Sequence, residues 1–292
     1  MPSPAPATPS LEPPASAARE TPMFFESGER PLYAVFHAAR RERAEAPVVV
    51  YCHSLGVEQL TNYRNQVNLA RAAAALGLPA FRYHARGHGD SGGDYADVTF
   101  AALVEDARAA AAQARALAGA ARIVWVGERV GALVAAAALA DDPQVAGLAL
   151  WEPVHRPAEY FRAMLRGMLF SQVAHGARPN ETVDQLLERL ARDGKVDVHG
   201  YYLHRELVES LKPIALAQSL SRWSGPTLVA QVQARPRLAP ANAQLAAALE
   251  ARGARVTTLA VAEEPGWHFI SNPAWESETL VRGTAEWLDG LA

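Results

Sequence analysis

Apolar residues in this chain gather in short runs that alternate with longer segments of helical periodicity. The runs lie at Ala46–Cys52, Pro79–Tyr83, Arg122–Val126 and Val145–Trp151, and the first is a continuous β-branched run, as buried strands often are. Helical segments follow the first three runs, at Asn62–Leu76, Phe100–Leu117 and Val130–Ala140. Because neighbouring parallel strands need long crossover connections, this alternation predicts a mostly parallel central sheet with helices on both faces.

Segments before and after this core extend the sheet. Strands expected at Met23–Glu26 and Leu32–His37 flank a polar turn and predict a hairpin at the sheet edge. The alternation resumes near the C-terminus, with strands expected at Thr227–Val232 and Val256–Val261 and helices at Asn242–Arg252 and Glu276–Leu288. We therefore expect one α/β domain over residues 23–292.

Between residues 152 and 224 the alternation stops. Helical segments are expected there at Tyr160–Phe170, Val183–Ala191 and Glu206–Leu220, the last broken at Pro213. This stretch predicts a helical cap, inserted after the strand that ends at Trp151.

The first 22 residues differ in composition from the rest. They are rich in Pro, Ala, Ser and Thr and contain no continuous apolar stretch, so they cannot bury enough apolar surface to offset chain entropy. We expect a disordered leader over residues 1–22, which has neither the basic start nor the apolar core of a signal peptide.

Charge and cysteine content narrow the function classes. The formal net charge of -3 provides no basic field for nucleic acid. A single cysteine, Cys52, allows no internal disulfide, and the chain is expected in the cytoplasm. The most apolar run, Ala132–Ala140, stops far short of the ~20 residues of a membrane span. We expect no nucleic-acid partner, no membrane span, no cofactor and no metal ion.

A glycine frame at residues 127–131 indicates where chemistry would take place. It matches the nucleophile motif of serine hydrolases, G-x-S-x-G, and lies between an expected strand and an expected helix, as that motif requires. Arg129 occupies the serine position. A guanidinium has no lone pair with which to attack a carbonyl, so Arg129 cannot form an acyl-enzyme.

Two further loops, taken together with this motif, resemble those of a known protein family. His53-Ser54-Leu55-Gly56 is similar to a His-Gly oxyanion loop, and Arg86–Gly93 is similar to an R-G-x-G-x-S-x-G loop, although His84 stands where Asp is usual. Their order and spacing resemble the α/β-hydrolase superfamily over residues 23–292. The resemblance implies the α/β-hydrolase fold and a catalytic triad whose members follow the order serine, acid and histidine.

A narrower resemblance concerns the motif and its surroundings. The segments 128–133, 148–154 and 89–97 are similar to a bacterial branch whose turn reads G-x-R-x-G. That branch includes the exosortase A system-associated hydrolase 2-like proteins. The resemblance implies a place beside exopolysaccharide and protein-sorting genes and assigns no substrate.

The remaining triad positions are incomplete. The stretch 233–249, where the acid would fall, contains neither Asp nor Glu, which leaves Glu152 as a weak candidate acid. His268 holds the position of the catalytic histidine, and it either lines a ligand site or is a hydrogen-bonded loop residue. Cys52, Ser54 and Ser91 are more simply explained as structural residues than as nucleophiles.

Arg129 supports two interpretations. In an open pocket, it would bind a carboxylate or phosphate together with the backbone N–H groups of Val130, Ser54 and Leu55, because a helix N-terminus favours anions. In a closed pocket, Glu128 or Glu152 would neutralise it, since an unpaired buried charge is too costly.

An apolar stripe on the predicted cap, from Tyr160 to Phe170, fits an acyl-type ligand or simple packing of the cap onto the core. We therefore predict a pseudohydrolase that binds a small-molecule anion or an acyl-type ligand. The alternatives are an active esterase or acyltransferase with an unassigned nucleophile, and a scaffold for a protein partner in an exopolysaccharide or protein-sorting system.

Overall fold

The computed structural model describes residues 20–41, 43–176, 178–267 and 275–291. In this part of the chain, one eight-stranded sheet has the order β1-β2-β4-β3-β5-β6-β9-β10. The pairs β1–β2 and β2–β4 are antiparallel and the other neighbours are parallel. The strands are β1 (Glu20–Ser27), β2 (Arg30–His37), β3 (Val48–Cys52), β4 (Ala80–Tyr83), β5 (Ile123–Glu128), β6 (Val145–Trp151), β9 (Thr227–Gln233) and β10 (Val256–Ala262).

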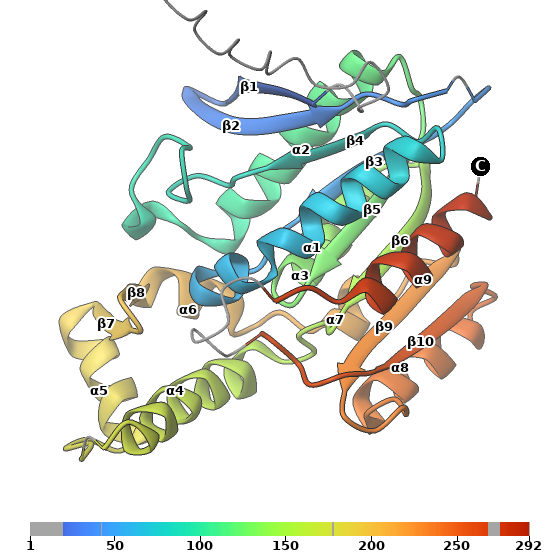
Figure 1. Cartoon of the computed structure of the whole chain (residues 1–292). Coiled ribbons are helices and arrows are strands. Elements are labelled where there is room, and N and C mark those ends of the chain that lie inside the picture. Colours follow the sequence, from blue (N-terminus) through green and yellow to red (C-terminus); the bar gives the residue numbers. More distant parts are fainter. Residues whose placement is uncertain (1–19, 42, 177, 268–274, 292) are drawn as a thin grey trace, which may run out of the picture.

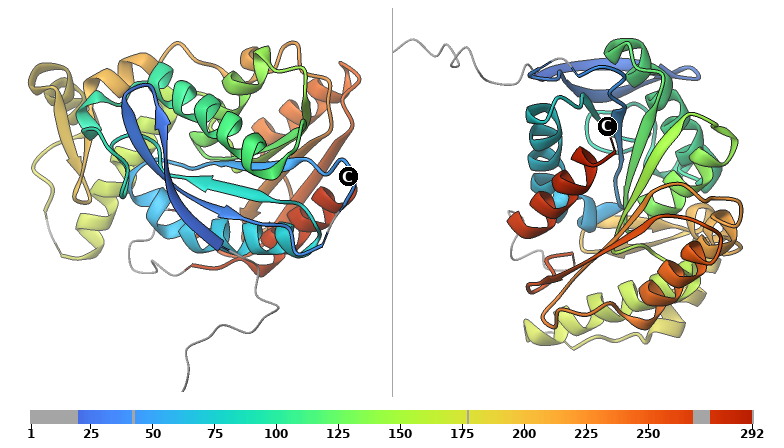
Figure 2. Two further views of the ribbon diagram at one scale, coloured as in Figure 1. Left: turned by 90° about the horizontal axis from the view of Figure 1, so that it is seen from above. Right: turned by 90° about the vertical axis from the view of Figure 1, so that its right-hand side faces the viewer.

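Helices cover both faces of the sheet, as the alternating pattern predicts (Figures 1 and 2). One face carries α1 (Gly56–Ala75) and α9 (Glu278–Asp289). The other carries α2 (Phe100–Ala118), α3 (Gly131–Ala138) and α8 (Pro240–Glu250). The short 3₁₀ helices η1 (Tyr95–Asp97) and η2 (Leu139–Asp141) lie in the connections. Among the described helices, none is long and apolar enough to cross a membrane.

The central strands are mostly apolar because both of their faces are buried. In β3, Val48, Val50 and Cys52 join the core beneath α2 and α3. Val49 and Tyr51, which alternate with them, join the core beneath α1 and α9. Such two-sided burial is typical of parallel sheets, and it explains why these strands appear in the sequence as continuous apolar runs.

In the described residues between β6 and β9, the chain forms four helices and a hairpin. The helices are α4 (Pro157–Ala174), α5 (Val183–Asp193), α6 (Arg205–Leu211) and α7 (Leu216–Ser219). The predicted break at Pro213 separates α6 from α7. The hairpin of β7 (Lys195–Val198) and β8 (Tyr201–His204) was not predicted. Its sequence signal is a short alternation of apolar and polar residues, interrupted by a turn at His199 and Gly200, both with positive φ.

Two predicted boundaries are wrong. The strand β1 begins at Glu20, inside the predicted leader, and residues 1–19 lie outside the described part of the chain. The helix α1 begins at Gly56, not at Asn62. Its first turns bury Glu58 and Thr61, and tertiary hydrogen bonds to these polar side chains stabilise a helix that local periodicity does not indicate.

Candidate functional site

Arg129 lies at the tip of the turn between β5 and α3. Its φ of 51° is in the left-handed region, which is strained for a residue with a side chain. A Cβ atom added to Gly131 would collide with the Cys52 carbonyl group, and one added to Gly127 would collide with the backbone of Ala132. The two glycines are therefore required by the close approach of strand and helix, whichever residue stands between them.

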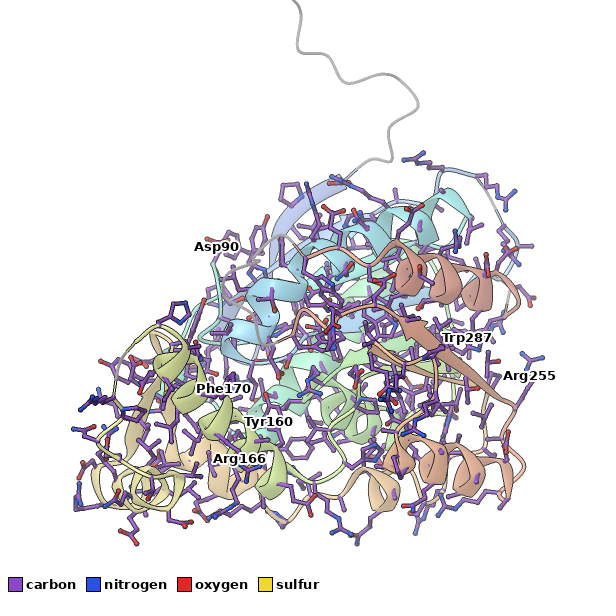
Figure 3. All side chains as sticks on the ribbon, turned by 60° about the horizontal axis from the view of Figure 1, so that its bottom comes forward. Asp90, Tyr160, Arg166, Phe170, Arg255 and Trp287 are labelled. Atoms are coloured by element: carbon purple, nitrogen blue, oxygen red, sulfur yellow. The ribbon has the colours of Figure 1, made fainter. Side chains whose placement is uncertain are left out.

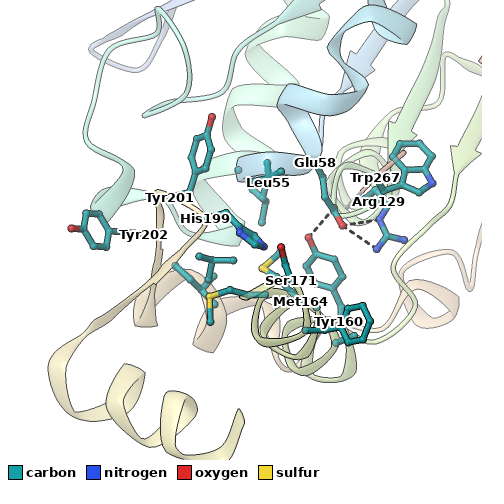
Figure 4. Close-up of a pocket in the computed structure, with 18 of the residues that line it drawn as sticks. Leu55, Glu58, Arg129, Tyr160, Met164, Ser171, His199, Tyr201, Tyr202 and Trp267 are labelled. Carbon is teal, nitrogen blue, oxygen red and sulfur yellow. Dashed lines mark hydrogen bonds and ion pairs between the residues drawn. The ribbon is translucent and has the colours of Figure 1, made fainter. Parts of the chain in front are cut away.

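The guanidinium of Arg129 forms an ion pair with Glu58, in the first turn of α1 (Figure 4). Its Nε donates to Glu58 Oε1 at 3.1 Å, and its Nη1 donates to the backbone oxygen of Glu152 at 3.2 Å. The side chains are only 14% and 5% exposed. The guanidinium carbon also lies 5.4 Å from the centre of the Tyr160 ring, within the range of a cation–π contact.

Glu58 is held by side chains from three separate elements. Its Oε2 accepts hydrogen bonds from the Ser54 hydroxyl at 2.6 Å and from the Tyr160 hydroxyl at 2.9 Å. Arg129 binds its other oxygen. The prediction that Glu128 or Glu152 would neutralise Arg129 is wrong, because Glu58 supplies the carboxylate.

Glu128 belongs to a buried network that shares Ser54 with the Arg129–Glu58 pair. Its carboxyl accepts hydrogen bonds from the Tyr51 hydroxyl at 2.6 Å and from Ser54 N–H and Gln66 Nε2 at 3.0 Å each. Burial raises the pKa of Glu128 to about 8, although these donors oppose the shift. The predicted role of Ser54 as an anion-binding donor is wrong, because Glu128 takes its N–H group and Glu58 takes its hydroxyl.

Glu152 lies at the end of β6, also with a positive φ of 44°. Its carboxylate accepts the Val232 N–H group at 2.8 Å, at the end of β9. Burial raises the pKa of Glu152 to about 7, and the nearby Arg129 charge opposes this. A catalytic role for Glu152 stays a prediction, as does any role for His268, which lies outside the described residues.

A cavity of about 710 Å³ opens above the ion pair, between α4, the β7–β8 hairpin and the start of α1. Figure 4 shows Glu58, Arg129 and Tyr160 together at one end. Most of the remaining lining is apolar, and it includes Leu55, Met164, Met168, Val198, Leu203 and Trp267. We name this space the first cavity. The pocket is thus open and Arg129 is nevertheless paired, a combination that neither sequence interpretation contains.

The candidate ligand residues are divided between the cavity and the core. Arg129 and Leu55 line the first cavity, whereas Val130 and Ser54 are fully buried. Burial raises the pKa of the Cys52 thiol to about 12, so Cys52 offers no thiolate. Figure 3 shows Tyr160, Arg166 and Phe170 along α4, the helix that carries the predicted apolar stripe.

Glu58 is the residue that sequence reasoning missed. It follows Ser54 by four positions, which is about one helical turn. This spacing, together with a helix that starts at Gly56, would have placed its carboxylate beside the turn. The hydroxyl of Tyr160 was also missed, because that residue was considered only as part of an apolar stripe.

The chain also matches a known protein family. A family model described as serine aminopeptidase, S33, matches residues 60–222. No curated protein matches the chain significantly.

Solved structures resemble the chain along nearly its whole length. Est1E from Butyrivibrio proteoclasticus, with ferulic acid bound, superposes with a TM-score of 0.67 at 16% identity, over 92% of this chain and 98% of its own. An esterase of Pyrococcus furiosus gives 0.65 at 14% identity, over 99% and 96%. Proline iminopeptidase of Mycobacterium smegmatis gives 0.60 at 16% identity, over 92% and 98%. These similarities confirm the predicted α/β-hydrolase fold.

Proposed function

Since the chain belongs to the serine aminopeptidase (S33) family, we propose a function that keeps the fold of this family without its serine chemistry. The chain acts as a pseudohydrolase that binds a small molecule with an apolar body and an uncharged polar head group. One observation carries this proposal, the buried Arg129–Glu58 ion pair at the end of an open, mostly apolar cavity.

The residue at the tip of the turn argues against acyl-enzyme chemistry. Arg129 supplies no nucleophilic lone pair, and its guanidinium is held by Glu58 and by the Glu152 carbonyl oxygen. The site can therefore hold and orient a ligand, but the position that normally attacks it carries a cation.

Electrostatics favours an uncharged head group over the anion that the sequence predicts. A ligand carboxylate at Arg129 would lie close to the Glu58 carboxylate. At 4 Å, two like charges near a protein surface repel each other by about 4 kcal/mol. The repulsion between Glu58 and the ligand carboxylate therefore cancels the attraction that Arg129 would exert on that carboxylate at the same distance. The cost of removing the anion from water then remains. An amide or ester carbonyl avoids this cost and still accepts a hydrogen bond, because a guanidinium has more N–H groups than these contacts use.

The shape and lining of the first cavity define the rest of the ligand. Its volume of about 710 Å³ is within the range of small-molecule sites. Met164 and Met168 on α4 line the wall beside the ion pair, and methionine side chains adapt to differently shaped apolar groups. A medium-length acyl chain fits this description.

The test compares ligands that carry different head groups on alkyl chains of six or seven carbons. Octanamide, octanoate and hexyl phosphate are titrated into the protein at pH 8 by calorimetry. We expect octanamide to bind at least tenfold more tightly than octanoate, and hexyl phosphate to bind least tightly. Tighter binding of octanoate than of octanamide by the unchanged protein would overturn the proposal.

A single substitution sharpens this comparison. In Glu58→Gln the side chain keeps its size and loses its charge, so Arg129 becomes available to an external carboxylate. We expect octanoate affinity to rise at least tenfold while octanamide affinity changes by less than threefold. Ala163→Trp, which fills the first cavity from an exposed position on α4, is the control and should weaken both ligands.

The sequence alternatives remain predictions with separate requirements. An active hydrolase needs another nucleophile, and Ser171 on α4 is a serine that lines the first cavity. Membership of the exosortase-associated branch also remains a prediction. A scaffold role within that branch requires a protein partner that co-purifies with the chain.

A further inference from the structure

A second cavity, of about 490 Å³, lies on the other side of the β7–β8 hairpin. Residues from α1, from the loop between β4 and η1, and from the hairpin line it. Gly56, Tyr95, Tyr201 and Tyr202 line both cavities. The two spaces are therefore neighbours, but the second does not include the Arg129–Glu58 pair among its lining residues.

Aromatic side chains make up half of the residues that line the second cavity. Ring centres of Tyr63 and His84 are 5.8 Å apart, those of His88 and Tyr95 are 4.7 Å apart, and those of Tyr95 and His204 are 6.0 Å apart. The rings meet edge to face or tilted, which is the favourable arrangement for aromatic groups. A further ring brought into this space would find partners of the same kind.

Two glycines allow these rings to come so close to the backbone. A Cβ atom on Gly89 would collide with the His84 ring, and one on Gly87 would collide with the Tyr95 backbone. Both glycines have positive φ values, 52° and 69° respectively. The loop is therefore shaped so that His84 and Tyr95 can stand against it.

The charges around the second cavity exclude ionic ligands. Among the described residues that line it, none is Lys or Arg, and Asp94 carries a carboxylate that repels anions. A cation is disfavoured as well, because Arg82 lies 5.2 Å from the Tyr63 ring centre and Lys195 lies 4.4 Å from that of Tyr202. Two of the four tyrosine rings that line the cavity therefore already contact positive charges.

The polar groups of the wall suit a ligand hydroxyl. The Nδ1 atom of His88 donates to the Arg86 carbonyl oxygen at 2.9 Å, while its buried Nε2 has no partner among the described residues. Burial lowers the pKa of His88 to about 4, so the ring is neutral and its Nε2 atom can accept a hydrogen bond. Burial also lowers the pKa of His84, although the nearby Asp90 charge opposes this shift.

We propose that the second cavity is a binding site for a small uncharged aromatic molecule that carries a hydroxyl group, a phenol. The ring packs among Tyr63, His84, Tyr95 and His204, and the hydroxyl hydrogen-bonds to the imidazoles. This inference does not rest on the function proposed for the first cavity, and the two can fail separately.

The test uses phenol itself as the probe. Phenol, anisole, cyclohexanol and benzoate are titrated into the full chain and followed by saturation-transfer NMR and calorimetry. We expect phenol to bind with a Kd on the order of 1 mM, as suits so small a ligand. Anisole lacks the hydroxyl donor, cyclohexanol lacks the aromatic ring and benzoate is charged, so each should bind at least fivefold more weakly.

Matched substitutions locate the site. Leu60 is 47% exposed and lines the second cavity, so Leu60→Trp fills that cavity without disturbing the core. It should weaken phenol at least tenfold, whereas Ala163→Trp in the first cavity should change phenol affinity less than twofold. Equal binding of cyclohexanol and phenol, tighter binding of benzoate than of phenol, or a loss of phenol binding only in Ala163→Trp would each overturn the proposal.

Discussion

Replacing Arg129 with Met tests whether the ion pair is the structural centre of this site. Met keeps much of the apolar stem and also has a Cβ atom, so the strain of the positive φ at residue 129 is unchanged. The substitution removes the positive charge and leaves Glu58 beside the cavity with its hydrogen bonds from Ser54 and Tyr160.

The expected cost follows from burial. Removing one partner of a buried ion pair costs about 3–5 kcal/mol, because the other charge stays buried. The two side chains here are 14% and 5% exposed, so this range applies. Since Ser54 and Tyr160 still donate to Glu58, we expect the lower end, about 3 kcal/mol. A loss of this size should lower Tm by roughly 6–12 °C for a domain of this size.

The measurement is thermal and urea unfolding followed by circular dichroism. Arg156→Met is the matched control, because Arg156 and Glu159 form an ion pair of the same length, 3.1 Å, with side chains 74% and 71% exposed. Such an exposed pair contributes about 0–1 kcal/mol. The double variant Arg129→Met with Glu58→Gln should recover at least about 1 kcal/mol, because it removes both charges of the buried pair.

Two results would refute this reasoning. If Arg129→Met costs no more than Arg156→Met, the pair is not desolvated in the way its burial indicates. If the double variant loses the sum of the two single losses, then Arg129 and Glu58 do not stabilise each other.

Three further predictions concern the rest of the site. The pKa of the Glu128 carboxyl is raised from 4.5 to about 8, so in this range the folded chain keeps the proton that the unfolded chain has lost. The free energy of unfolding should therefore fall as pH rises from about 4.5 to about 8. Unfolding of Glu128→Gln, measured across the same range, should show a smaller fall. A fluorophosphonate probe should leave the chain unlabelled by mass spectrometry, whereas labelling that Ser171→Ala abolishes would establish the hydrolase alternative. Gly131→Ala should cost more than about 3 kcal/mol in urea unfolding, because the new methyl group meets the Cys52 carbonyl group. Gly167→Ala, in open space on α4, should instead stabilise the chain by about 0.5–1 kcal/mol. Equal effects of the two substitutions would contradict the steric account.

Local patterns predicted most of the fold. Strands buried on both faces are continuously apolar, and amphipathic helices repeat with their own period, so both kinds of element can be recognised without tertiary information. The β7–β8 hairpin was missed because its strands are only four residues each, too short to show a clear period. The start of α1 was missed because its first turns bury polar side chains whose partners are distant in sequence.

The sequence by itself determined the order of the main-sheet strands and their helices, the turn with its two required glycines, and the cation that stands in place of a nucleophile. It also showed that a buried guanidinium needs an anion, but it could not tell which one. The tertiary structure decides which carboxylate pairs with Arg129. It brings Glu58 to Arg129 across 71 positions of the chain, whereas the Glu128 carboxyl accepts a hydrogen bond from Tyr51. Periodicity describes the face on which a residue lies, whereas charge pairing depends on which elements meet in space.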